Sequence, residues 1–371
     1  MNVRSFVYSA LPGRVVFGPG ASRERLAEEV DRLGTRRLLL VVTEQERALA
    51  LELAAVLGDR VVDFFTQVAP HMPVDVARRA RASAREAQAD GLLSIGGGST
   101  TGTAKAVALK TGLPILAVPT TYAGSEMTPV WGMTEDRRKT TGTDPVVLPK
   151  VVIYDPELTF SLPPQITGPS AMNAMAHCVE AFYAPGANPI TSLIAEEGIR
   201  ALAHGAPGAV ARPGELEGRS ETLYGAYLAG AAFAVAGSAL HHKICHVLGG
   251  AYGLPHAELH TVVLPHATAF NAQALPAVQE RVARALGAAG DDAAGGLYDL
   301  AEALGAPTAL ADIGMQESDL DEAVGLVLEK VPADNPRPVD EAGIRELLED
   351  AFSGRRPTTA LAGHAAQEGG A

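Results

Sequence analysis

The pattern of apolar residues changes once along this 371-residue chain, near residue 156. Before that point, short runs rich in Val, Leu and Ile alternate with amphipathic stretches, which is typical of strands and helices in a parallel sheet. After it, Ala-rich helical segments separated by Gly and Pro follow one another, without a convincing strand. A chain of this length exceeds one compact core. We expect an α/β Rossmann-like domain over residues 1–156, an all-α domain over 157–356 and a frayed tail over 357–371.

Six short runs predict the strands of the sheet. Each is rich in β-branched residues or leucine. Amphipathic stretches between them, such as the one that begins at Ser22, predict the helices that cover the sheet. The predicted strands cover residues 14–18, 37–43, 61–65, 91–97, 114–121 and 150–156.

Charge and composition exclude several classes of partner. The formal net charge is -13 and no long Lys/Arg run occurs, so we expect neither a nucleic-acid nor a membrane partner. Residues 223–240 carry no charge and approach the length of a membrane span, but they are largely Gly, Ala and Ser, which favours a buried helix. With only two cysteines and no basic and apolar leader, the sequence predicts a cytoplasmic protein.

A glycine cluster stands between a predicted strand and a predicted helix, in the run SIGGGSTTGTAKAVALK at residues 94–110. Glycine lets a backbone approach a ligand closely, and the free N–H groups at a helix N-terminus attract an anion. The cluster lacks GxGxxG spacing, and a tight connection is the alternative interpretation. We assign a cofactor phosphate site to Gly96, Gly97, Gly98, Ser99 and Thr100.

The loop VPTTYAGSEMTP at residues 118–129 follows the next predicted strand and is rich in hydroxyl groups. At the carboxyl edge of a parallel sheet, such groups bind ribose and phosphate oxygens. A polar surface loop is the alternative. We assign Thr120, Thr121 and Ser125 to the cofactor, and Tyr122 and Thr128 to the substrate.

Two charged residues bear on the choice of cofactor. Glu44 follows a predicted strand, where a carboxylate binds ribose hydroxyls and disfavours a 2′-phosphate. Lys139 is assigned to the cofactor phosphates, although a solvated lysine is the commoner outcome. The sequence thus favours NADH and leaves NADPH open.

The helical half concentrates histidines at regular spacing. Asn173 and His177 lie four residues apart, as do His242 and His246, so each pair shares one helix face. A lone histidine is usually a core residue, but paired faces of this kind are typical of metal sites and proton-transfer sites. The full set of candidate residues is Asn173, His177, His241, His242, His246 and His256.

Several motifs follow one another in fixed order along nearly the whole chain: a glycine turn at residues 18–20, the GGGST turn, the PTTYAGSE loop, the DPELTFSLPP linker and the histidine segments. With these motifs the chain resembles the iron-containing alcohol dehydrogenase superfamily. The resemblance implies a dehydroquinate synthase-like fold, in which an α/β nucleotide-binding domain is followed by a helical catalytic domain.

In that superfamily a divalent metal is typically held by an aspartate, a histidine one turn later and two further histidines. The matching positions here are Asn173, His177, His242 and His256. A neutral amide is a poorer ligand for Fe or Zn than a carboxylate, so we expect no metal, with the three histidines as ligands if one is bound. The two cysteines adjoin His177 and His246 but point away from this face, and we expect them to be buried apolar groups.

The runs YAGSEMTPVWG, AMNAMAHCVEAFYA and LHHKICHVLGG are similar to the maleylacetate reductase branch of this superfamily. This resemblance implies reduction of the C=C bond of 2-maleylacetate, or of a substituted maleylacetate, to 3-oxoadipate in the degradation of aromatic compounds. The cofactor would be NADH or NADPH and the substrate a small dicarboxylate. We also expect a homodimer.

Hydride addition to the double bond of such an enone generates an enolate, which needs a hydrogen-bond or proton donor. We hypothesise that His242 and His246 form this donor and relay, and that Asn173 holds a histidine tautomer. His177 and His256 would shape the pocket. Lys243 is the alternative catalytic donor to the enolate, and the substrate carboxylates are also assigned to it. His241 is assigned to substrate binding without a defined role.

Three rival interpretations stay open. A metal-dependent alcohol or polyol dehydrogenase of the same fold would use Asn173 as a metal ligand. A lyase of the dehydroquinate synthase type would need a denser set of Lys and Arg. A non-catalytic nucleotide-binding scaffold would bind the cofactor without oxidising it.

Overall fold

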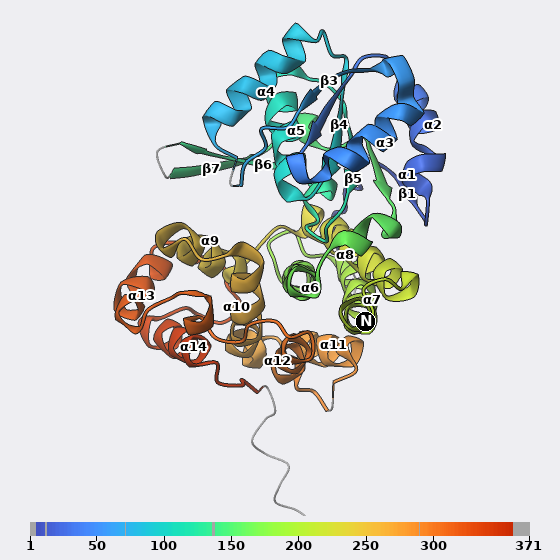
Figure 1. Ribbon diagram of the computed structural model, residues 1–371. Coiled ribbons are helices and arrows are strands. Elements are labelled where there is room, and N and C mark those ends of the chain that lie inside the picture. Colours follow the sequence, from blue (N-terminus) through green and yellow to red (C-terminus); the bar gives the residue numbers. More distant parts are fainter. Residues whose placement is uncertain (1–4, 12, 71, 136–137, 289, 359–371) are drawn as a thin grey trace, which may run out of the picture.

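The computed structural model describes residues 5–11, 13–70, 72–135, 138–288 and 290–358. An α/β domain and a helical domain lie one against the other (Figure 1). The fold class expected from the sequence is therefore confirmed. Of the expected tail at residues 357–371, all but residues 357 and 358 lie outside the described part of the chain.

A six-stranded parallel sheet forms the centre of the α/β domain, in the order β1-β8-β5-β4-β2-β3. Each predicted strand is present. The chain runs outward in opposite directions from β2 and from β4, so a crevice opens between the carboxyl ends of these two neighbours. The bounds are β1 (Arg14–Phe17), β2 (Leu38–Val42), β3 (Val61–Phe65), β4 (Gly91–Gly96), β5 (Ile115–Pro119) and β8 (Val151–Tyr154).

Strand β2 is buried on both faces because helices cover both sides of the sheet. Leu38, Leu40 and Val42 pack in one core cluster with α1, α2 and α3. Leu39 and Val41 point to the other face and pack with α4 and α5. The helices are α1 (Ala21–Glu24), α2 (Leu26–Leu33), α3 (Arg47–Leu57), α4 (Val74–Glu86) and α5 (Gly98–Thr111).

The sequence did not predict the antiparallel hairpin of β6 (Val130–Glu135) and β7 (Arg138–Thr143), which projects from the α/β domain (Figure 1). Its strands contain Gly and few β-branched apolar residues, so the pattern of a strand is weak. Trp131 packs across the hairpin on Gly142, where any side chain would meet the indole ring at 2.5 Å. The position of the Trp131 ring in the hairpin therefore requires glycine at residue 142.

The second domain is built from helices alone in its described part. A 3-10 segment at Pro156–Ser161 leads into it from β8. Small residues allow close approach: a Cβ on Gly205 of α7 would lie 2.6 Å from the backbone nitrogen of Thr222 of α8. The helices are α6 (Pro164–Glu180), α7 (Pro189–Ala211), α8 (Leu216–Ala236), α9 (Leu240–Tyr252), α10 (His256–Asn271), α11 (Pro276–Leu286), α12 (Ala293–Ala303), α13 (Leu320–Leu328) and α14 (Glu341–Ser353).

The two domains share one apolar core where the sheet meets α6. Val152 and Tyr154 of β8 pack in the same buried cluster as Met172 and Met175 of α6. The uncharged stretch at residues 223–240 falls on α8 and the start of α9, which meet at a bend of 99°. Among the described helices, none alone is both long and apolar enough to cross a membrane, and α8 with α9 meets the length and hydropathy criteria only as this bent pair.

Candidate active site

A cavity of about 580 Å³ is lined by residues of both domains. The α/β domain contributes the N-terminus of α5, the loop after β5 and the hairpin. The helical domain contributes α6, α8, α9 and the first residue of α10. The polar and aromatic lining residues are Ser99, Lys105, Ser125, Thr128, Trp131, Thr141, Asn173, His177, Phe233, His242, His246 and His256.

The predicted glycine turn lies at one wall of this cavity. Gly96 ends β4 with φ +136°, and Gly97 precedes α5 without any side-chain cap on the helix N–H groups. A Cβ on Gly97 would come within 3.0 Å of Thr121, and Thr100 donates its hydroxyl to the Gly97 carbonyl at 2.6 Å. Ser99 and Gly98 line the cavity itself. The turn therefore offers uncapped N–H groups of a 14-residue helix to an anion.

The acid beside this turn is Glu46, which the sequence analysis missed. Its carboxylate accepts hydrogen bonds from Thr43 at 3.0 Å and from Thr120, and a side chain on Gly96 would collide with it. The predicted residue, Glu44, is exposed instead and pairs with Arg47 at 3.3 Å. A 3-10 turn at Glu44–Glu46 follows β2, and it directs the third residue rather than the first into the crevice.

Histidines from α6 and α9 stack at the floor of the cavity. The rings of His177 and His242 lie 5.2 Å apart and nearly parallel, and Phe233 of α8 packs against both, at 4.5 and 5.0 Å between centroids. Both histidines are buried, whereas His246 and His256 are exposed. The predicted group of histidines is thus divided between a dry floor and a solvent-facing rim.

Glu180, the last residue of α6, holds His242 in place, and the sequence analysis did not identify it. Its carboxylate lies 2.5 Å from Nδ1 of His242 and also accepts the backbone N–H groups of Ala239 and His242 at the start of α9. Burial raises the pKa of the Glu180 carboxyl and lowers the pKa of His242 to about 3. Both shifts favour the uncharged forms of the two groups, which meet at the short contact with Nδ1.

Three buried polar atoms of the cavity residues have no hydrogen-bond partner in the described part of the chain. They are Oδ1 of Asn173, Nδ1 of His177 and Nε2 of His242. The amide oxygen of Asn173 therefore holds no histidine tautomer there, and Glu180 has that role for His242. Unpaired buried polar groups are costly, which is typical of a site that a ligand completes.

The four residues matching the superfamily's metal ligands do not fit one ion as they stand. Ligand nitrogens on a single metal lie within about 4.2 Å of one another, given bonds of about 2.1 Å. Among the described His, Cys, Asp and Glu residues, a group of three with ligand atoms all within 4.8 Å occurs only at His241, Cys245 and His260. The cavity histidines do not converge in this way, and Asn173 brings no negative charge.

Other assigned residues lie outside the cavity lining. Tyr122 is fully buried and accepts a hydrogen bond from Arg219 at 3.3 Å, so it cannot contact a substrate there. Lys243 follows His242 by one residue, which on a helix turns it away from the cavity face. His241 is also buried on another face of α9. Lys139 lies in β7, and its side chain is outside what the structure describes.

The cation that lines the cavity is Lys105 of α5, which the sequence analysis did not single out. Its ammonium donates to the Ser125 carbonyl at 2.6 Å, to the Thr128 hydroxyl at 3.0 Å and to the Val130 carbonyl at 2.8 Å. Burial lowers its pKa to about 7. Lys105 thus fixes the predicted hydroxyl-rich loop against the helix that follows the glycine turn.

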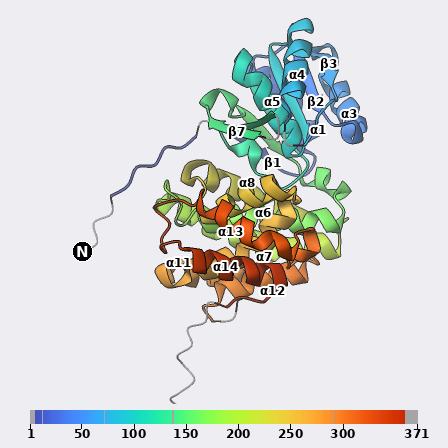
Figure 2. The same ribbon diagram turned by 90° about the vertical axis from the view of Figure 1, so that its left-hand side faces the viewer.

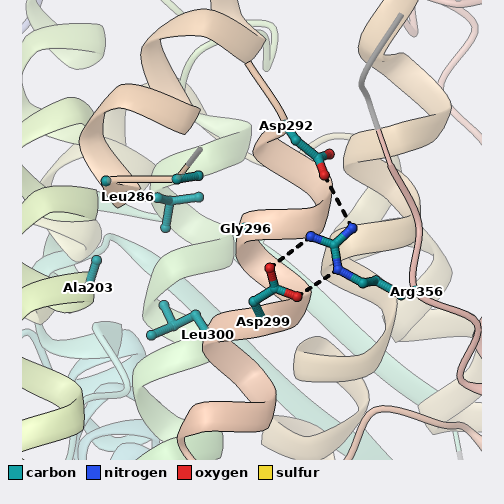
Figure 3. Close-up of a pocket in the computed structure, with 9 residues that line it drawn as sticks. Ala203, Leu286, Asp292, Gly296, Asp299, Leu300 and Arg356 are labelled. Carbon is teal, nitrogen blue, oxygen red and sulfur yellow. Dashed lines mark hydrogen bonds and ion pairs between the residues drawn. The ribbon is translucent and has the colours of Figure 1, made fainter. Parts of the chain in front are cut away.

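A second hollow, of about 420 Å³, lies within the helical domain. Figure 3 shows its polar groups pairing with one another: Arg356 contacts Asp299 at 2.6 and 2.7 Å and Asp292 at 3.2 Å. Leu286 and Leu300 supply apolar walls. These ion pairs hold the segment after α14 against α12. The charged groups of the hollow therefore have a structural role, and we do not assign a ligand to it.

Comparisons with known proteins agree with this geometry. The family models for iron-containing alcohol dehydrogenase and its C-terminal domain match residues 12–156 and 167–352. A maleylacetate reductase from Sphingobium indicum is 51% identical, over 96% of this chain and 99% of that protein.

Two crystal structures extend the likeness. Maleylacetate reductase from Agrobacterium tumefaciens is 45% identical with a TM-score of 0.92, covering 96% of this chain and 100% of that one. Sulfoacetaldehyde reductase from Bifidobacterium kashiwanohense in complex with NAD+ is 26% identical with a TM-score of 0.87, covering 95% and 100%. The expectation that no metal is bound gains no support, because the matching family is described as iron-containing.

Proposed function

The chain belongs to the iron-containing alcohol dehydrogenase family, and on that premise we propose that it reduces the C=C bond of 2-maleylacetate and substituted maleylacetates to 3-oxoadipates. This reaction belongs to the degradation of aromatic compounds. The relatives named maleylacetate reductase, 45–51% identical over nearly the full chain, support it. The observation that carries it is that one cavity joins the glycine turn to the Glu180–His242 pair.

The glycine turn fits the diphosphate of NADH. Gly97 and Gly98 leave room beside uncapped N–H groups, and a Cβ on Gly97 would fill this space against Thr121. Glu46 stands in the crevice between β2 and β4, where a carboxylate binds ribose hydroxyls and repels a 2′-phosphate. We therefore favour NADH over NADPH. When bound, NADH supplies the hydride that adds to the alkene carbon remote from the ketone.

His242 stabilises the charge that this addition creates. In this proposal the uncharged Glu180 carboxyl group donates to Nδ1, so the hydrogen of the imidazole is on Nε2. Nε2, which has no partner among the described residues, then donates a hydrogen bond to the ketone oxygen as that oxygen becomes an enolate. A neutral imidazole serves as such a donor. The proton needed at the second alkene carbon arrives from the rim, where His246 is exposed with its ring 6.1 Å from that of His242. Hydride and proton together saturate the double bond.

A dianionic substrate requires positive potential in a chain whose net charge is -13. The buried Lys105 ammonium and the N-terminus of α5 both lie at the cavity. We assign the carboxylates to this side, with the Ser125 hydroxyl as a neighbouring donor. The Thr128 hydroxyl instead donates to the Ser125 carbonyl at 3.1 Å. Lys105, in its protonated form, contributes positive potential here in place of Lys243, while its three N–H groups stay bonded to the loop.

We propose that this reduction uses no metal held by Asn173 and the cavity histidines, because their donors neither converge nor bring a charge. The test is an absorbance assay with purified enzyme, NADH and maleylacetate, with and without prior EDTA treatment. We expect NADH oxidation at equal rates. The contrary result would be an enzyme that does not reduce maleylacetate but oxidises simple alcohols or reduces aldehydes, and that loses this activity with EDTA. That result would establish a metal-dependent alcohol dehydrogenase.

We further propose a cytoplasmic homodimer that binds neither nucleic acid nor membranes. The segment of residues 5–11, which precedes β1, runs away from the body of the molecule (Figure 2), and its Phe6 and Val7 are 46% and 88% exposed. It leads into β1, an edge strand of the sheet. Apolar side chains on an extended arm are typical of an association surface. Light scattering after gel filtration tests this, and a monomer at micromolar concentration would contradict it.

A further inference from the structure

A second cluster of potential ligands lies behind the active site, between α9 and α10. His241 and Cys245 are four residues apart on one face of α9, and His260 lies in the second turn of α10. Nε2 of His241 is 2.9 Å from Nδ1 of His260, and the sulfur of Cys245 is 3.7 Å from the same Nε2. All three side chains are buried, at 0–2% exposure.

We propose that His241, Cys245 and His260 bind a divalent ion of the zinc type, which joins α9 to α10. Zinc is bound by imidazole nitrogen at about 2.0–2.1 Å and thiolate sulfur at about 2.3 Å. Tetrahedral bonds of these lengths place two nitrogens about 3.4 Å apart and nitrogen and sulfur about 3.6 Å apart. The His–Cys separation already agrees, and the His–His separation must open by about 0.5 Å.

The donor set also decides which kind of ion is suited. Two imidazoles and one sulfur favour soft and borderline ions over Mg²⁺ or Ca²⁺, which prefer oxygen. On binding, the thiol of Cys245 loses its proton to solvent and the sulfur takes the metal bond. The site then carries one net positive charge.

The proposed site adjoins residues of the active site on both helices. The ring of His241 lies 5.3 Å from that of His242, and the ring of His260 lies 4.4 Å from that of His256. An ion that fixes α9 against α10 would therefore fix His242 relative to the rim histidine. In this chain the metal would support the catalytic residues from behind instead of polarising the substrate.

Cobalt(II) is the most direct probe of the site, because thiolate ligation gives an intense near-ultraviolet charge-transfer band that histidine and asparagine ligands cannot give. The full chain would be expressed in minimal medium with Co(II) as the added metal, since a fully buried site exchanges slowly. We expect about one Co(II) per chain with this band. Protein that is folded but metal-free, or Co(II) bound without the band, would overturn the proposal.

Variants locate the ion. Cys245→Ser should lose the band and most of the metal, whereas Cys178→Ser, at the other buried cysteine, should keep both. His256→Ala, at the position of a superfamily ligand, should also keep the metal. Retention in Cys245→Ser with loss in His256→Ala would place the ion in the cavity and refute the site proposed here. If Cys245→Ser does not fold, the wild-type Co(II) spectrum still decides.

Discussion

Helix α9 presents two sets of histidines in opposite circumstances. His242 and His246 line the cavity, and the nitrogen of His242 that does not face Glu180 has no partner among the described residues. His241 and Cys245 face α10, where His241 pairs with His260. His241 and His242 are consecutive, yet they point to different faces of α9 because successive residues turn by about 100° around a helix. Chemistry here depends on the face of a helix and not on residue type.

The largest effect should follow from removing the cavity histidine. We expect His242→Ala to lower kcat by about 100- to 10,000-fold, since it removes the hydrogen-bond donor to the developing enolate. NADH binding, followed separately by fluorescence titration, should change little, because the glycine turn lies in the wall that the α/β domain contributes and His242 lies on α9. Unchanged turnover would exclude His242 from the reaction.

A substitution at Glu180, the hydrogen-bond partner of His242, should show whether Glu180 positions His242 for the reaction or only packs against it. Burial raises the carboxyl pKa of Glu180, and the proposed mechanism uses the protonated carboxyl group, so kcat of the wild type should fall as pH rises through this pKa. Glu180→Gln should lower kcat by about 10- to 100-fold and abolish this alkaline decline, because an amide cannot ionise. A pH–rate profile of both proteins tests this; an unaltered decline would assign it to another group.

A substitution at His241, the buried neighbour of His242, should lower stability and leave substrate binding unchanged. His241→Asn removes the 2.9 Å hydrogen bond and leaves His260 unpaired in the interior, which costs about 1–3 kcal/mol of stability. We expect a Tm lower by several degrees with the KM for maleylacetate unaltered. A raised KM at normal Tm would return His241 to the substrate site that the sequence suggested for it.

A second pair of nearby residues repeats the comparison on a smaller scale. Glu46 reaches the glycine turn, whereas Glu44 pairs with Arg47 at the surface. We expect Glu46→Gln to shift the ratio of kcat/KM values for NADPH over NADH upward by about fivefold, which corresponds to about 1 kcal/mol. Glu44→Gln is the matched control and should leave the ratio within about twofold. The reverse result would restore Glu44 as the selective residue.

Much of the candidate site was accessible from spacing alone. The interval of four residues placed Asn173 with His177 and His242 with His246, and all four line the cavity together with His256. A glycine turn between a strand and a helix likewise predicted the uncapped start of α5, which lies at the cavity. Periodicity sufficed because these residues act along a single helix or at a single strand end, where backbone geometry is regular.

Partners from distant parts of the chain could not be found in this way. Glu180 follows His177 by three residues, a spacing that could have drawn attention to it, but only the packing of α6 on α9 brings it to His242. Lys105 seemed an ordinary helix residue and contacts the loop after β5 through tertiary structure. Tyr122 seemed available to a ligand until the fold placed Arg219 against it.

By itself, the sequence determined the sheet strands, the change to helices after residue 156 and the order of the chemical motifs. Those properties follow from local backbone preferences and from the period of apolar residues. Only the tertiary structure decided which histidine lines the cavity and which packs between α9 and α10, which glutamate reaches the glycine turn and which lysine lines the cavity. Each of those choices depends on what lies opposite a side chain, and that is set by packing between elements far apart in the chain.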